Sequence, residues 1–188
     1  MTSIGAVMKS AWQRLVAVVQ DRPWIITLIT FLLVIVHFLL VHFKIWADSW
    51  ATLLASPDRG MAIYLGAASA SAIVAGFAGV VVVFGLTATG EKFRNLRLDA
   101  GQSLGSNWTS SSVSGFSAAG VSLMAAIATA TGQFFWAPWL LEWSLLLLLH
   151  GTIRIIWLLR ILMGIVAAQD AADAKKSKTV TLGENYFN

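Results

Sequence analysis

Residues 145–160, LLLLLHGTIRIIWLLR, decide the fold class of this chain. The run is apolar enough to lie in a lipid bilayer, yet it carries Arg154. A charge inside hydrocarbon costs roughly 2.5–3.5 kcal/mol on insertion scales, so such a residue usually pairs, lines a cavity or marks a pathway. Three further apolar stretches precede this one. The chain is therefore predicted to be an all-α integral membrane protein.

The composition of the whole chain supports a bilayer environment. Of its 188 residues, 57% are hydrophobic and only 12% are charged, and the mean hydropathy is +0.75. Soluble domains carry about 25% charged residues, and a soluble core of this size could not bury so much apolar surface. The chain has no cysteine, which excludes disulfides, thiolate zinc sites and cysteine nucleophiles.

Four transmembrane helices are predicted within residues 23–168. Their approximate spans are residues 24–43, 61–87, 113–132 and 139–168. Each span holds the roughly 20 residues that are needed to cross about 30 Å of hydrocarbon. The two longer spans are expected to tilt or to project from the membrane.

The orientation of the spans is predicted from the basic residues that flank them. Nine lie before the first span, between the second and third spans, and after the fourth span, whereas Lys44 and Arg59 lie on the opposite side. By the positive-inside rule, both termini are predicted to be cytoplasmic in a plasma (inner) membrane. The pI of about 9.8 then indicates anionic lipid headgroups rather than nucleic acid as the partner of these residues.

Two segments outside the spans complete the predicted domain organisation. Residues 1–22 are expected to form an amphipathic interfacial helix, because apolar residues such as Trp12 share one stripe while Lys9 and Arg14 lie off it. A helix packed beneath the bundle is the alternative. The polar tail, residues 169–188, is expected to extend the last helix briefly and then become disordered.

The connection at residues 91–108 is the candidate docking surface of the chain. Apolar residues recur there at every fourth position, with basic residues nearby. The candidate residues for docking a cytoplasmic protein or lipid are Lys92, Arg94, Arg97 and Trp108. Simple packing at the membrane interface is the alternative.

Small residues at four-residue spacing mark the second and third spans. The candidate helix-packing residues are Gly76, Gly79, Gly115, Ala119 and Ser122. Small side chains let helix backbones approach closely in a membrane, where lipid offers no hydrophobic drive for association. Because the small residues occupy more than one face, a homo-oligomer is predicted. A monomeric bundle that uses every face internally is the alternative.

The last span carries the candidate intramembrane polar residues Glu142, His150 and Arg154. His150 and Arg154 are four residues apart and share one face, whereas Glu142 lies about 18 Å from Arg154 along a helix. The antiparallel first span places His42 near the depth of Glu142, which predicts a structural pair. Arg154 finds no acidic residue at its own depth. It could snorkel to phosphates, line an oligomeric pore, or bind lipid or substrate in a pocket.

No motif in the chain indicates an enzyme. Residues 115–120, GFSAAG, do not complete the nucleophile pattern G-x-S-x-G, because Ala119 occupies the last position. HExxH, P-loop and dinucleotide-binding motifs are absent from the sequence, and three isolated histidines do not suggest a metal site. We therefore expect no enzymatic activity, no cofactor and no bound metal.

These features predict a small oligomeric membrane channel or membrane-permeability effector. Glu142 would lie at its outer mouth, with His150 and Arg154 facing an inner path. The alternative is a non-conducting scaffold or sensor subunit that docks a cytoplasmic partner through residues 91–108. The four-span layout is compatible with bacterial or prophage-encoded defence systems, on layout alone.

Overall fold

The described part of the chain is built from helices alone. The computed structural model describes residues 23–184, with the helices α2 (Pro23–His42), α3 (Ser49–Leu53), α4 (Pro57–Thr87), α5 (Glu91–Ala130) and α6 (Ala137–Glu184). Within that range, four helices are long and apolar enough to cross a membrane. The predicted all-α class and the four apolar helices are therefore confirmed. The interfacial helix expected at residues 1–22 lies outside the described residues.

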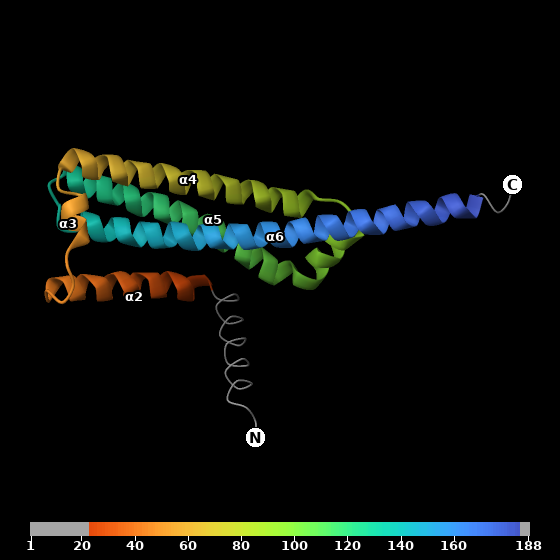
Figure 1. The fold of residues 1–188 in the computed structure, drawn as a ribbon, viewed down its shortest axis with the longest axis horizontal. Coiled ribbons are helices and arrows are strands. Elements are labelled where there is room, and N and C mark those ends of the chain that lie inside the picture. Colours follow the sequence, from red (N-terminus) through yellow and green to blue (C-terminus); the bar gives the residue numbers. More distant parts are fainter. Residues whose placement is uncertain (1–22, 185–188) are drawn as a thin grey trace, which may run out of the picture.

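The long helices form an antiparallel bundle with α2 at its side. Figure 1 shows α4, α5 and α6 lying together, with α2 beyond α6. α5 packs along both α4 and α6, whereas α2 contacts mainly α6. α2 begins and α6 ends at the same end of the bundle, the tail end, which also holds the α4–α5 connection (Figure 1). The opposite end, the loop end, holds α3 and residues 131–136.

Local signals in the sequence determine where the helices begin and end. Ser56 Oγ accepts a hydrogen bond from the backbone nitrogen of Arg59 at 3.3 Å, and Pro57 is the first residue of α4. This combination is typical of helix N-termini. Gly90 and Gly132 have positive φ angles of 123° and 79°, which glycine adopts without strain, and they separate α4 from α5 and α5 from α6.

Residues 91–108 are the first part of α5 rather than a separate connection. Gly101 and Gly105 lie inside a helix that continues to Ala130, and Figure 1 shows α5 bending in this region. Glycine-containing stretches are common sites of helix bends. Phe93, only 4% exposed, packs against Leu158 and its neighbours and thereby fixes the start of α5 on α6.

The polar tail also differs from the expectation of early disorder. α6 continues without a break to Glu184 and extends past the bundle (Figure 1). The tail contains alanine and lysine, which favour helix. A hydrogen bond of 3.0 Å joins Gln169 Nε2 to Asp173 Oδ2 one turn later. These local interactions favour continuation of the helix beyond the apolar part of α6.

The core of the bundle is a seam of mostly small residues. Its buried positions follow one another in steps of three and four, which is the periodicity of helices packed at a shallow left-handed angle. Buried residues along the seam include Tyr64, Ala68, Ser71, Ala75 and Ala78 in α4; Ser111, Ser114, Gly115, Ala118, Ser122, Ala125 and Thr129 in α5; and Ala137, Leu141, Ser144, Leu147, Gly151, Ile155, Leu158 and Leu162 in α6.

α4 and α5 approach each other closely at Gly115. A Cβ atom there would lie 2.9 Å from the Cβ and 3.0 Å from the Cα of Ala75 on α4. Gly76 and Gly79 lie beside this contact but not in it, since an added Cβ at either meets nothing within 4 Å. The buried positions of α4 and α5 alternate between steps of three and four residues. A row of small residues spaced strictly four apart therefore turns away from the contact between the helices after about two turns. Ala119 is half-buried.

Gly115→Ala is expected to destabilise the bundle by about 1–3 kcal/mol, because overpacking forces α4 and α5 apart. That loss exceeds the roughly 1 kcal/mol that alanine gains over glycine in a helix. The matched control is Gly120→Ala on the same helix, where an added Cβ meets nothing within 4 Å. Unfolding of the reconstituted protein by SDS titration gives both free energies. Equal values for the two variants would contradict the proposed contact.

Candidate functional site

The main polar cluster at the loop end is formed around Glu142 of α6. His37 Nδ1 on α2 lies 2.8 Å from both carboxylate oxygens of Glu142, and Trp50 Nε1 on α3 donates to Oε2 at 2.9 Å. The side chains of His37 and Glu142 are 26% and 16% exposed. We call His37, Trp50 and Glu142 the loop-end cluster. It joins three helices through one carboxylate.

Neighbouring residues hold the members of this cluster in place. Asp48 Oδ1 accepts a hydrogen bond from the backbone nitrogen of Ala51 at 3.0 Å and so caps α3, which carries Trp50. The ring of Trp139 stands edge-on to the ring of His37, with centroids 5.5 Å apart. The cluster is therefore fixed by packing and by a helix cap as well as by its own hydrogen bonds.

His42 does not reach Glu142 in the structure. Its exposed ring stacks on Phe38, with centroids 5.8 Å apart and an interplanar angle of 21°. The partner of Glu142 is instead His37, five residues earlier and therefore on a different face of α2. The structural pair predicted for His42 and Glu142 is therefore replaced by a pair between His37 and Glu142.

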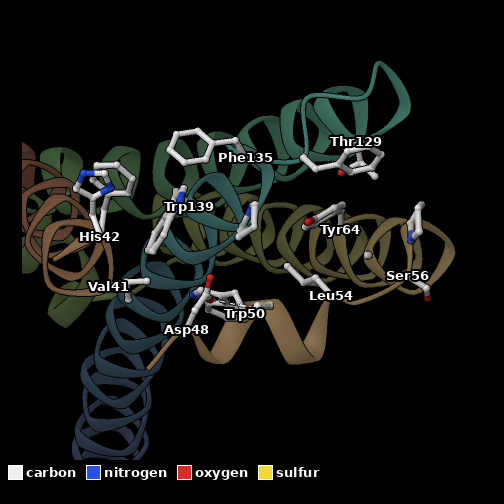
Figure 2. A pocket seen from close by; sticks show the side chains of 16 residues that line it. Val41, His42, Asp48, Trp50, Leu54, Ser56, Tyr64, Thr129, Phe135 and Trp139 are labelled. Carbon is white, nitrogen blue, oxygen red and sulfur yellow. Dashed lines mark hydrogen bonds between the residues drawn. The ribbon is translucent and has the colours of Figure 1, made fainter. Parts of the chain in front are cut away.

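A cavity of about 410 Å³ lies next to the loop-end cluster. Figure 2 shows aromatic side chains around it, with Phe135, Trp139, Trp50 and Tyr64 on different sides. Trp50 belongs to both features, because its indole nitrogen binds Glu142 while its side chain lines the cavity. The carboxylate of Asp48 lies on the same side as Trp50 (Figure 2).

Serine side chains connect α5 to α6 along the seam. Ser144 Oγ donates to the carbonyl oxygen of Ala118 at 2.8 Å and lies 2.6 Å from Ser122 Oγ, which therefore donates to it. Ser114 Oγ donates to the Leu147 carbonyl at 2.8 Å. Ser111 Oγ donates to the Gly151 carbonyl in the same way, at 3.1 Å. These serines hold the two helices together, as polar residues do in membranes.

Of the three candidate polar residues of α6, His150 and Arg154 lie one turn apart, whereas Glu142 lies away from both. Arg154 is 9% exposed, and it lies seven residues after Leu147, on the face that packs against α5. The register of the serine bonds places it level with residues 107–108 of α5. His150 is half-buried, and its Nε2 has no hydrogen-bond partner among the described residues. Glu142 faces α2 and α3 instead.

The candidate docking residues all lie on α5. Arg94 is exposed, whereas the side chains of Lys92, Arg97 and Trp108 lie outside the described part of the chain. The neighbouring Phe93 is buried. Arg94 is therefore presented by a turn of helix that is anchored to the bundle.

Sequence reasoning missed Trp50 and His37 as partners of Glu142. Depth along the helices could have identified His37. It lies five residues before the end of α2, and Glu142 lies five residues after the start of α6, so in antiparallel helices the two residues are level. Within residues 23–184, no group of three or more potential ligands could hold a metal ion. No protein-family model, curated protein or solved structure matches this chain.

A double-mutant cycle is expected to detect the pair between His37 and Glu142. Combining His37→Ala with Glu142→Gln should show a coupling of about 1 kcal/mol, because each change alone leaves the other partner unsatisfied in a half-buried site. Unfolding in SDS measures the free energies. His42→Ala combined with Glu142→Gln is the control, with a coupling near zero expected. Stronger coupling to His42 than to His37 would refute the pairing.

Proposed function

We propose that this chain is a membrane scaffold or sensor subunit that docks a soluble protein at the tail end of its bundle. The observation that carries the proposal is the length of α5 and α6. They contain 40 and 48 residues, so they are about 60 and 72 Å long. The hydrocarbon layer is only about 30 Å thick. Both helices therefore have far more length than a crossing requires, and the excess lies at the tail end (Figure 1).

The anchoring of α5 supports a role for this excess length in recognition. The buried Phe93 fixes the first turn of α5 against the cluster of Val81, Leu158 and Leu162. Arg94, the next residue, is exposed. A charged side chain on an anchored helix loses little backbone entropy on binding, which favours a specific contact.

The internal use of the polar residues also favours a scaffold over a pore. Glu142 is bound to His37 and Trp50 of the same chain. The seam serines bind carbonyl groups of the facing helix. Glu142 and Arg154 lie on different sides of α6. A single face of this helix therefore does not present both side chains to one conduction path.

Photo-crosslinking in native cells tests the docking proposal. A photoreactive residue in place of the exposed Asn95 is expected to capture a discrete soluble protein, and adding Arg94→Glu should reduce that adduct at least tenfold, because reversing a charge at an interface costs several kcal/mol. The matched control is Arg59→Glu, which reverses an exposed charge at the loop end. Adducts with lipid alone, or a protein adduct unaffected by Arg94→Glu, would contradict the proposal.

A channel is the second candidate, and the outer face of α4 favours it. Small residues are exposed there, including Gly66, Ser69 and Gly76, and an added Cβ at either glycine meets nothing within 4 Å. Such a face allows close packing with a second copy in a membrane. We propose that the chain forms a homo-oligomer through this face, which is the assembly that a pore in a bacterial or prophage-encoded membrane effector would require.

Planar-bilayer recordings distinguish the two candidates. The scaffold proposal predicts no single-channel current from purified, folded, oligomeric protein. A current that changes in Arg154→Ala, but not in the control Arg160→Ala at an exposed position of the same helix, would establish the channel instead. A current that neither variant alters would contradict both the scaffold and the role of Arg154 in a conduction path.

A further inference from the structure

The cavity at the loop end has a composition that suits a particular class of ligand. It lies between α2, α3, α4 and the start of α6, and its volume of about 410 Å³ is within the range of small-molecule sites, roughly 300–1,000 Å³. Figure 2 shows the rings of Phe135, Trp139, Trp50 and Tyr64 on different sides of it. Its aromatic lining residues are Phe38, Trp50, Tyr64, Phe134, Phe135 and Trp139.

The rings form walls at right angles to one another. Phe38 lies 5.2 Å from Trp139 and 5.8 Å from Phe135, centroid to centroid, and is nearly perpendicular to both, with interplanar angles of 86°. In such edge-to-face pairs the positive edge of one ring meets the negative face of the other, so neighbouring rings stand at right angles as walls of the cavity. A cation within about 6 Å of the face of such a ring is attracted to it. Recognition of ammonium groups by aromatic cages uses this arrangement.

The charged residues around the cavity have the matching sign. Asp48 lines it, whereas no lysine or arginine is among its described lining residues. One oxygen of Asp48 caps α3, which fixes the carboxylate in position. His42 is the other titratable side chain in the lining besides Tyr64. The ring of His42 stacks on Phe38 and adds a further ring to the wall.

One wall of the cavity is held before any ligand arrives. Trp50 cannot rotate freely because its indole nitrogen donates to Glu142 at 2.9 Å. The same carboxylate is held by His37. Preorganised walls reduce the conformational entropy lost on binding. The loop-end cluster therefore acts as the support of the cavity.

We propose that this cavity binds a small organic cation, an alkylammonium group that the aromatic rings enclose and Asp48 neutralises. The group could belong to a free solute or to the headgroup of a zwitterionic lipid, since the cavity lies at one end of the apolar helices. The proposal is independent of partner docking at the tail end. Tyr64 and Thr129 provide hydroxyl groups that could hydrogen-bond to the rest of such a ligand.

Calorimetric titration of the full chain in maltoside micelles tests the charge requirement. Choline is the probe, and 3,3-dimethylbutan-1-ol, its neutral carbon isostere, is the matched control. Choline is expected to bind about tenfold more tightly, which corresponds to the 1–2 kcal/mol typical of cation–π attraction. Equal affinities would overturn the proposal and assign the cavity to apolar ligands. Absence of choline binding both in micelles and in the nanodiscs described below would also overturn it.

Two pairs of variants locate the binding at this cavity. Asp48→Asn keeps a good helix cap but removes the charge, and we expect choline affinity to fall about fivefold, whereas Asp58→Asn at the same end should leave it unchanged. Trp139→Leu should weaken binding about tenfold, with Trp136→Leu, an exposed tryptophan outside the lining, as its control. Equal effects within either pair would place the binding elsewhere.

Nanodiscs distinguish the two sources of the cation. If a lipid headgroup fills the cavity, added choline should not bind in phosphatidylcholine discs but should bind in phosphatidylglycerol discs, and native mass spectrometry should retain phosphatidylcholine in the wild type but not in Asp48→Asn. If the ligand is a free solute, choline should bind equally in both. Phosphatidylcholine retained equally by wild type and Asp48→Asn would overturn the role of the carboxylate.

Discussion

Close approach of three helix backbones is the constraint on which the rest of this structure depends. In hydrocarbon, helices gain little by burying apolar side chains, so association relies on packing and interhelical hydrogen bonds. Gly115 against Ala75 brings α4 to α5 at the distance where a single added methyl group would clash. Serine hydroxyls then bond to carbonyls across the α5–α6 contact, which is possible only because the side chains between them are small. Most of the large apolar residues lie instead on the exposed outer surfaces of the helices.

α2 and α3 lie outside this seam and depend on a different interaction. A carboxylate at an intermediate depth is expensive unless it is paired, and Glu142 obtains its partners from both elements. Its hydrogen bonds therefore join α2 and α3 to α6, together with the ring contacts Phe31–Trp143 and Phe38–Trp139 between α2 and α6. The same bonds fix Trp50 as a wall of the adjacent cavity. Glu142 thus both holds the helices of the loop end together and fixes one wall of the cavity.

The fold class could be predicted because long apolar runs specify membrane helices without knowledge of their partners. The finer contacts could not. When the first residue of a helix is uncertain, the depth of each of its side chains is known only to within about one turn. His37 and His42 are little more than one turn apart, so the sequence did not show which of them reaches Glu142. Small residues spaced four apart coincide with the buried positions of a helix for about two turns and then diverge from them. For this reason Ala75 and Ala78 are buried in the seam, whereas Gly76 and Gly79 lie beside it. The helical start of α5 depends on the tertiary anchor Phe93, which outweighs the low helix propensity of Gly101 and Gly105.

The position of Arg154 follows from the same register and bears on its role. Glu142 is level with His37, and α2 and α6 run in opposite directions, so Arg154 lies level with Ile25, in the first turn of α2. On α5 the same level falls at residues 107–108, immediately before the apolar span Thr109–Ala130 begins. Two of the four apolar segments therefore end where Arg154 lies, while α4 and α6 continue beyond it. Glu142 and Arg154, about 18 Å apart along α6, bracket a section that contains no Asp, Glu, Lys or Arg. Arg154 is therefore buried close to a change from apolar to polar sequence in two neighbouring helices.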